Sequence, residues 1–435
     1  MDNAWAQTVL GAICRFQAGD AFGRDDQGRT FGDHPFIKVS DMNLVGNEIY
    51  ISRANNWVSD EEAQQNYRLH PKNAVVFAKI GIALTYNRRR RLVRPTIIDN
   101  NMMSAVPTPD VDPVWFYYLL STIDFNLISS GSALPYLTVK DLSRIEIEVP
   151  PNREQQTIAS VLGALDNKIE LNRRMNETLE AMARAIFKDW FVDFGPTRAK
   201  MAMRGEDPQR ENVVRAPYLA PDIWSLFPDR IDDEGRPEGW EVRSLDQIAH
   251  FLNGLALQKY PDQGQGSLPV IKIAQLRAGH ADASDRASTD IPESYVVEDG
   301  DLLFSWSGSL IHRIWTGGRG ALNQHLFKVT SDMFPKWFVF YWIGHHMPDF
   351  QATAASKATT MGHIQRHHLT QATAIVPSDP VMTAANELVS PIFNRMIAND
   401  IETRTLASTR DLLLPKLMSG EIRVREAEKI VGEVV

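Results

Sequence analysis

Basic side chains gather in two windows of the chain that contain no Asp or Glu. No acid lies between Ala63 and Ile98, and eight Lys and Arg side chains fall in that window. Acids are again absent between Leu302 and Ser331, where three Lys and Arg side chains are present. Lys and Arg on an acid-free surface suit phosphate binding, because they neutralise phosphate charge and release counterions. The two windows predict nucleic acid as the ligand.

Two further acid-free stretches, 125–140 and 350–378, extend these windows. The candidate DNA-binding set combines basic side chains with amides that can hydrogen-bond base edges. Its members are Lys79, Arg88, Arg89, Arg90, Arg91, Arg94, Lys140, Arg313, Arg319, Asn323, Lys357, Gln365 and Arg366. Taken alone, the run of four arginines is more typical of a solvated loop, but the matching windows later in the chain favour binding.

Motifs for catalysis are missing from the sequence. There is no G-x-x-x-x-G-K-[ST] loop for a nucleotide, and "SWSGS" lacks the leading glycine of a nucleophile elbow. The histidines of "GHHMPDF" and "GHIQRHH" do not have H-E-x-x-H spacing, so core or groove-facing histidines are favoured over metal ligands. The pattern predicts a protein that binds without catalysing, with no cofactor or metal of its own.

Composition places the chain among globular proteins. Its 435 residues exceed one ordinary core, and 43% hydrophobic with 23% charged residues argues against disorder. The net charge of −8 would speak against a nucleic-acid binder, but the acids lie outside the basic windows. Cys14 is the only cysteine, which excludes an internal disulfide framework and fits a reducing cytoplasm. We expect neither a signal peptide nor a membrane helix.

The chain contains an internal duplication, and the two copies contain the helices and strands that position these residues. "PFIKV" matches "PVIKI" at an offset of 234, "VVFAKIG" matches "LLFSWSG" at 227, and "LTVKDLSRIEIEVP" matches "IQRHHLTQATAIVP" also at 227. Matches in the same order with a slowly drifting offset indicate duplication followed by loop changes. Short β-branched and aromatic runs in each copy predict strands, and "VWFYYLLS" and "KWFVFYWI" predict buried helices, although strands remain possible there.

A long helical pattern follows each copy. Its apolar seam repeats every seven residues, which is the signature of coiled-coil packing. The first helix is predicted over about 153–191 and the second over about 379–417. Asn172 and Asn399 interrupt the two seams at the same place, 227 residues apart. Asparagine at such a position costs stability and sets register, so we expect each to lie in the helix pair against a polar partner.

The pattern divides the chain into six segments. We predict modules at 1–150 and 239–377, helices at 151–194 and 378–425, an extended connector at 195–238 and a loose tail at 426–435.

The segment "PPNREQQTIASVLGALDNKIELNRRMNETLEAMARAIFKDWFVDF" closely resembles the central conserved region of specificity subunits of Type I restriction–modification systems. "LLLPKLMSGEIRV" resembles the C-terminal conserved region of that family, and "FPDRIDDEGRPEGWEV" and "LTVKDL" also resemble family segments. The resemblance covers essentially the whole chain. The two modules resemble the family more in their architecture than in their amino-acid sequence.

The resemblance implies an α+β fold of two duplicated target recognition domains, separated by two long antiparallel coiled-coil helices. Each domain would read one half of a split double-stranded DNA target, which is asymmetric because the two modules differ. The partners would be two methyltransferase subunits, which hold S-adenosylmethionine, and restriction subunits, which hydrolyse ATP and cleave DNA. Two alternatives stay open: a restriction–modification component with its own catalysis, and a protein-only coiled-coil scaffold.

Overall fold

The computed structural model describes residues 5–23, 27–131, 134–206, 217–262, 264, 266–282, 284–356 and 362–432. These form two compact units, residues 1–171 with 405–435 and residues 172–404. The division cuts both long helices, so each unit contains one module and one half of the helix pair.

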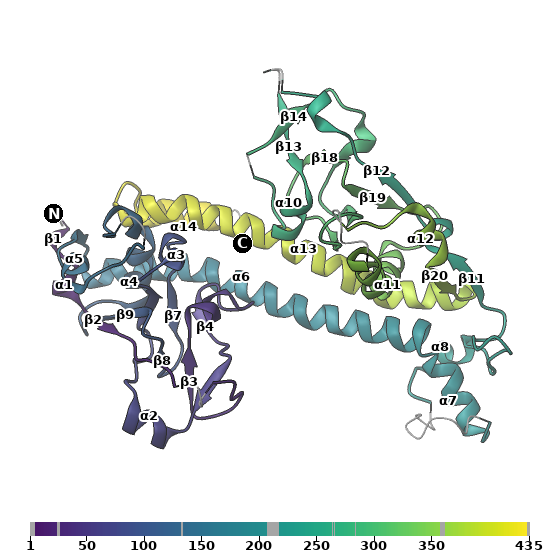
Figure 1. Ribbon diagram of the computed structural model, residues 1–435, viewed down its shortest axis with the longest axis horizontal. Helices are drawn as coiled ribbons and strands as arrows, with labels where there is room; N and C mark the ends of the chain where they lie inside the picture. The colour runs from purple at the N-terminus through teal and green to yellow at the C-terminus, as the bar shows by residue number, and fades with distance from the viewer. Residues whose placement is uncertain are drawn as a thin grey trace. The chain divides into compact units, whose positions relative to one another are not determined.

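The first module begins and ends in one two-stranded sheet, in which Ala6 of β1 pairs with Val149 of β10. Between them lie a five-stranded sheet of order β2-β9-β6-β7-β4 and a three-stranded sheet of order β5-β3-β8 (Figure 1). The elements of this module are β1 Ala6–Val9, α1 Leu10–Ile13, β2 Cys14–Ala18, β3 His34–Ile37, η2 Val39–Asn43, β4 Tyr50–Ile51, β5 Asn56–Val58, α2 Asp60–Asn66, β6 Val75–Ala78, α3 Ile82–Thr85, β7 Arg90–Leu92, β8 Ile97–Ile98, β9 Met102–Pro107, α4 Pro113–Thr122, η3 Phe125–Leu127, α5 Val139–Ser143 and β10 Glu146–Val149.

The second module repeats this plan. Glu241 of β11 pairs with Val376 of β20, and the larger sheets have the orders β12-β19-β16-β17 and β14-β13-β18-β15. Its elements are β11 Glu241–Ser244, α9 Leu245–Ile248, β12 His250–Asn253, η5 Leu257–Lys259, β13 Ser267–Ile271, α10 Ile273–Ala278, β14 Arg286–Ser288, η6 Glu293–Tyr295, β15 Val296–Val297, β16 Leu302–Ser305, β17 His312–Ile314, β18 Gly320–Leu322, β19 Leu326–Thr330, α11 Lys336–Ser356, α12 Arg366–Gln371 and β20 Thr373–Val376.

The strand pairing confirms the duplication that was inferred from the amino-acid sequence. The parallel pair Phe36 and Ile97 in the first module has its counterpart in Val270 and Ala321 in the second. The isolated bridge between Ile80 and Tyr136 likewise recurs between Ser307 and His363, with both partners shifted by 227 residues. The apolar runs of uncertain class are the helices α4 and α11. Asp112 caps α4 through hydrogen bonds of 2.9 Å from the backbone N–H groups of Val114 and Trp115.

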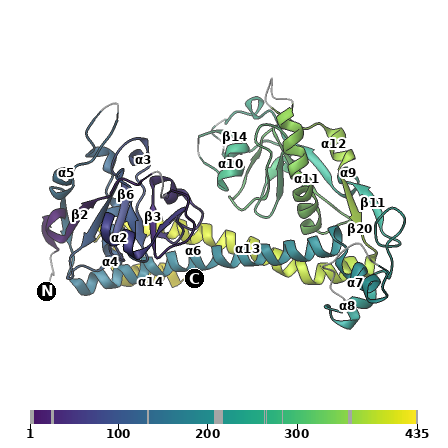
Figure 2. The same cartoon turned by 60° about the horizontal axis from the view of Figure 1, so that its bottom comes forward.

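The long helices are α6, Asn152–Phe187, and α13, Asp379–Met418, which agree with the predicted spans to within a few residues. A π-helical turn, Lys188–Val192, ends the first of them. Figures 1 and 2 draw α6 beside α13 within each unit. In the second unit α11 packs on both helices, with Tyr341 bonded to Glu180 of α6 at 3.0 Å and Trp337 to Asn386 of α13 at 3.0 Å. The predicted α+β class with two modules and two long helices is confirmed.

Two predicted irregular segments contain helices instead. The connector 195–238 holds α7, Gly195–Met203, and α8, Pro221–Leu226, and it is anchored by buried Phe227, whose ring lies 4.9 Å from that of Trp190. Residues 426–432 of the predicted loose tail belong to α14, Val424–Gly432, in which Ala427 is fully buried. α8 has six residues and α14 nine, too few for the seven-residue repeat by which the long helices were predicted.

Candidate nucleic-acid interface

The arginine run of the first module leads into strand β7, at one side of the five-stranded sheet. Val75 and Val76 of β6 pair with Arg91 and Arg90, while Tyr50 of β4 pairs with Arg91 on the other side. Neighbouring residues of an extended chain point to opposite sides. Four consecutive arginines therefore enter different surroundings.

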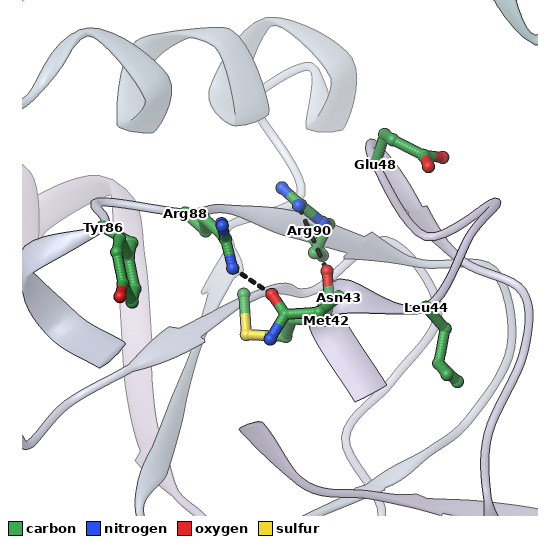
Figure 3. Close-up of a pocket in the computed structure, with 7 residues that line it drawn as sticks. All are labelled: Met42, Asn43, Leu44, Glu48, Tyr86, Arg88 and Arg90. Carbon is green, nitrogen blue, oxygen red and sulfur yellow. Dashed lines mark hydrogen bonds between the residues drawn. The ribbon is translucent and has the colours of Figure 1, made fainter. Parts of the chain in front are cut away.

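Arg88 is the exposed member of the run. It donates a hydrogen bond to Oδ1 of Asn43, and its guanidinium group lies 4.8 Å from the centre of the Tyr86 ring. Figure 3 shows the shallow pocket that these side chains share, which is lined by Met42, Asn43, Leu44, Glu48, Tyr86, Arg88 and Arg90. A guanidinium group stacked on an aromatic ring is held in place while its remaining N–H donors face solvent.

Arg89 is buried, with 3% of its surface exposed, so its assignment as a DNA contact is wrong. It donates to the Ile123 carbonyl oxygen at 2.6 Å and to Oδ1 of Asn87 at 2.9 Å, and it lies 3.5 Å from the centre of the Phe125 ring. Burial lowers the pKa of this guanidinium to about 9. Arg89 holds the chain between Tyr86 and Arg90 against the core.

The other basic residues of the first module lie at intermediate or exposed positions. Arg90 is half-buried and donates to the Met42 carbonyl oxygen at 3.2 Å, while half-buried Arg91 stacks on Tyr50 at 4.9 Å. Exposed Arg94 lies 5.7 Å from the Trp57 ring centre. Lys79 is half-buried just after β6, and Lys140 is exposed in the first turn of α5.

Two predicted contacts of the second module have structural roles. Asn323 is 4% exposed and accepts a hydrogen bond from the His325 backbone at 3.3 Å, so it is unavailable to read a base. Arg319 is exposed, but its guanidinium lies 3.2 Å from a Glu293 oxygen and 3.1 Å from a Glu298 oxygen. Both carboxylates come from outside the acid-free window and neutralise a charge that the local sequence left unpaired. Lys357 lies outside the described residues.

Two further candidates of the second module line a pocket that contains an indole ring. Gln365 and Arg366 line it with Asn253, Trp306, Phe327, His363 and Ile364. The Trp306 indole N–H donates to Oδ1 of Asn253 at 2.9 Å, which fixes the ring at the pocket. Sequence reasoning missed Trp306, although the repeat places it where the first module has Lys79. Arg313 lies elsewhere, on β17, where it donates to the Arg277 carbonyl oxygen at 3.3 Å.

Each asparagine of the helix seams lies in the helix pair against polar partners, as predicted, and the structure also brings the two together in the second unit. Asn172 is 1% and Asn399 0% exposed. Nδ2 of Asn172 donates to Oε2 of Glu402 at 2.7 Å and lies 3.5 Å from the Asn399 carbonyl oxygen, while Nδ2 of Asn399 donates to Asn176 at 2.8 Å. Each asparagine therefore has polar partners on the opposing helix, which the two chain directions bring together in antiparallel register.

The first unit joins its part of the helix pair by charge. Arg410 of α13 reaches Asp166 of α6 at 2.8 Å, and Asp166 is only 1% exposed. Tyr118 of α4 donates a 2.5 Å hydrogen bond to the same carboxylate. Burial and this neighbouring carboxylate raise the pKa of Tyr118 well above its usual value. The helices and the first module thus share one buried polar cluster.

Within the described ranges, no three His, Cys, Asp or Glu side chains lie close enough together to hold a metal ion. In the same part of the chain, no helix combines the length and the apolar character needed to cross a bilayer. The only cysteine, Cys14, is buried, and burial raises the pKa of its thiol to about 12.

Comparisons with known proteins agree with this architecture. A family model described as "Type I restriction modification DNA specificity domain" matches residues 3–181 and 237–404. The specificity subunit of Type I restriction enzyme MjaIX from Methanocaldococcus jannaschii is 28% identical over 413 residues, covering 91% of this chain and 88% of that protein. The specificity subunit of HindI from Haemophilus influenzae is 26% identical over 377 residues, covering 75% and 81%.

A solved structure has the same fold. The crystal structure of the Type I restriction–modification system S subunit from M. genitalium aligns with a TM-score of 0.56 at 14% identity, covering 96% of this chain and 97% of that one. At this identity the likeness concerns the fold alone.

Proposed function

The chain belongs to the family of Type I restriction modification DNA specificity domains, and from that premise we propose that each of its two modules reads one half of a bipartite DNA target. The observation that carries the proposal is the repeated framework with unlike surfaces. The bridge from Ile80 to Tyr136 and the bridge from Ser307 to His363 occupy the same place in the two modules. Beside them, Lys79 in one module is replaced by Trp306 in the other. Unlike surfaces on equal frameworks favour two unlike half-sites, and hence an asymmetric target.

Phosphate contacts and base contacts fall to different residues in this proposal. Arg88, Arg94 and Lys140 in the first module are exposed cations suited to phosphates. In the second module exposed Arg366 does the same, and Gln365 beside it offers an amide to base edges. Arg89, Asn323 and Arg319 are left out, because burial or ion pairing occupies them.

The helix pair is the proposed ruler between the half-sites. An α-helix of 36 residues, such as α6, is about 54 Å long. Half-sites one DNA turn apart are separated by about 34 Å. Asn172 and Asn399 contact each other across the pair, which makes them candidates for fixing its register and with it the preferred gap between the half-sites.

We further propose that the chain has no catalysis of its own. Two methyltransferase subunits would supply S-adenosylmethionine chemistry, and restriction subunits would supply ATP-driven cleavage. A component with its own catalysis would bind S-adenosylmethionine as the isolated chain, so titration calorimetry of the purified protein with that cofactor distinguishes the two. A protein-only scaffold would show no salt-sensitive DNA binding.

The test of the function is a map of methylated bases in cells that express the chain with its methyltransferase partner. We expect one bipartite, asymmetric motif with a fixed gap. Deleting the chain should remove methylation at this motif while other methylation remains. Methylation without a gap, or a palindromic motif, would refute the reading of two half-sites by two unlike modules.

A further inference from the structure

Four large apolar side chains of the first module are exposed at one end of its sheet. They are Ile82, Leu127, Leu134 and Tyr136, which are 72%, 84%, 56% and 43% exposed. We call them the apolar patch. Single exposed apolar residues are ordinary on a protein surface. Several that adjoin one another mark a surface that another molecule covers.

Backbone contacts bring the members of the apolar patch together. The Gly81 N–H donates to the Pro135 carbonyl oxygen at 2.8 Å, which places Leu134 and Tyr136 beside the start of α3, where Ile82 lies. A Cβ atom added at Gly81 would lie 3.6 Å from Cδ1 of Leu134. Nδ2 of Asn126 donates to the Thr85 carbonyl oxygen at 3.2 Å, which holds η3, and Leu127 in it, against the end of α3.

The charge around the apolar patch indicates what covers it. Lys79 precedes Gly81 by two residues, and exposed Lys140 lies in the helix that follows Tyr136. Neither 63–98 nor 125–140, the segments that contribute the patch, contains an acid. The partner must therefore carry negative charge where it meets the lysines around the patch and apolar groups where it meets the patch itself. A DNA major groove does both, because phosphates border it and the 5-methyl groups of thymine project into it.

Two of the four patch positions are polar in the second module. Ser309 replaces Ile82, His363 replaces Tyr136, and Arg366 stands where the first module has Val139. The bridges that align Tyr136 with His363 show that these replacements occupy equal positions in the framework. The second module therefore has the same backbone pairing with polar residues in place of Ile82 and Tyr136, although Met361 stands at the position of Leu134.

We propose that the apolar patch reads thymine methyl groups in the half-site of the first module. This inference rests on the proposed function and deepens it, because it assigns a base class to one of the two modules. In the first half-site, at least one thymine methyl group must contribute to the affinity. In the second half-site no thymine methyl group should contribute, because that module has Ser309, His363 and Arg366 at the corresponding positions.

The experiment replaces thymine by deoxyuridine, one position at a time, in a duplex that carries the mapped target. Binding is measured for the full chain assembled with its methyltransferase partner. Removing a methyl group that the patch covers should weaken binding about four-fold, since a buried methyl-sized group contributes about 0.8 kcal/mol. Several covered methyl groups should multiply this factor. Replacements in the second half-site should change binding by less than two-fold at every position.

Protein variants test the same contact from the protein side. Leu134→Ala and Ile82→Ala should bind the thymine duplex more weakly and should no longer distinguish thymine from deoxyuridine. Because both side chains are exposed, thermal unfolding should be unchanged, which separates lost contact from lost fold. The matched control is Ser309→Ala, at the position of Ile82 in the second module, and it should retain the thymine preference.

Four results separate the failures. If the wild-type complex binds no specific duplex, the proposed function itself fails. If it binds specifically but the first half-site has no thymine, or no replacement there weakens binding, the thymine inference alone is overturned. Leu134→Ala that still distinguishes the bases also overturns it. If Leu134→Ala instead loses assembly with the methyltransferase at unchanged DNA affinity, the patch is a protein contact.

Discussion

Strands β7 and β17 hold equal places in the two modules and carry unlike residues. Val75 pairs with Arg91 in the first module, and Leu302 pairs with Ile314 in the second. Two residues earlier along the chain stand Arg89, just before β7, and His312, in β17. The guanidinium group of Arg89 lies 3.5 Å from the centre of the Phe125 ring, and the ring of His312 lies tilted against Phe340 with the ring centres 4.6 Å apart. Burial lowers the pKa of both, to about 9 for the arginine and about 4 for the histidine.

The next position along these strands is an arginine in both modules. Arg90 donates to the Met42 carbonyl oxygen and Arg313 to the Arg277 carbonyl oxygen, each in the short helical segment that follows the preceding parallel strand. The comparison separates two kinds of position. At one of them a basic side chain, arginine or histidine, lies against an aromatic ring, and at the other an arginine joins the strand to a neighbouring helical segment. Exposed positions outside these two can differ between the modules without loss of structure, and these are the positions available for DNA recognition.

The helix pair also differs between the two units. The part of it in the first unit is joined by a buried ion pair, and breaking that pair should have the largest effect on stability. Arg410→Met leaves the Asp166 carboxylate, which is 1% exposed, without its cation. We expect the free energy of unfolding to fall by about 3–5 kcal/mol, because a buried charge loses its partner. Chemical denaturation measures the loss. The double variant Asp166→Asn with Arg410→Met should recover most of it, and failure to recover would mean that Arg410 acts through packing rather than charge.

His312 makes the stability of the second module sensitive to acid. Its folded pKa of about 4 lies below the usual histidine pKa of 6.5, because burial and then the nearby Arg184 disfavour the imidazolium form. The unfolded chain therefore binds the proton first. The stability that neutral His312 contributes is fully present above pH 6.5 and is lost as the pH falls toward 4, by about 3 kcal/mol.

His312→Phe keeps the stack on Phe340 without a titrating group. Its free energy of unfolding should fall less than that of the wild type between pH 6.5 and 4. His70 of the first module, whose pKa burial also lowers to about 4, is present in both proteins and serves as the shared background. Equal pH profiles would show that the His312 ring does not stay neutral in the folded state.

Arg89→Met tests whether the matching position of the first module is structural. Methionine fills similar volume but gives no hydrogen bond to the Ile123 carbonyl oxygen or to Asn87, so we expect about 2 kcal/mol less stability. Displacement of the neighbouring Arg88, a proposed phosphate contact, should also weaken binding to all sequences alike and leave discrimination in both half-sites unchanged. Loss of discrimination in the second half-site would contradict a role confined to the first module.

The sequence predicted the framework better than the surface. Repeated letters gave the two modules, and the seven-residue seam located α6, α13 and the facing Asn172 and Asn399. The failures share one cause, which is that a local window does not contain its tertiary partners. The run of four arginines looked uniform, yet Arg89, just before β7, is buried, and Glu293 and Glu298 reach Arg319 from another segment. Trp306 could have been found by aligning the copies, because it stands in the place of Lys79.

The asparagines of the second unit should behave oppositely to the ion pair of the first. Oδ1 of Asn172 and Oδ1 of Asn399 are buried with no hydrogen-bond partner in the described structure. Replacing both asparagines with leucine should therefore raise the free energy of unfolding by about 1 kcal/mol. We also expect the complex to tolerate targets with gaps one base pair longer or shorter, because the register constraint is lost. A gap preference as sharp as that of the wild type would refute the ruler role.

The smallest effect separates exposed from neutralised arginines in the two modules. Arg88→Ala should weaken binding to all sequences alike and reduce the slope of log affinity against log salt by about one, as expected for one lost phosphate contact. Arg319→Ala should leave that slope unchanged, because Glu293 and Glu298 already neutralise its charge and release of a counterion requires a free cation. Both slopes are measured with the same duplex and the assembled complex. Equal reductions would mean that DNA displaces the two carboxylates from Arg319, and the contrast between the modules would then lie in base contacts alone.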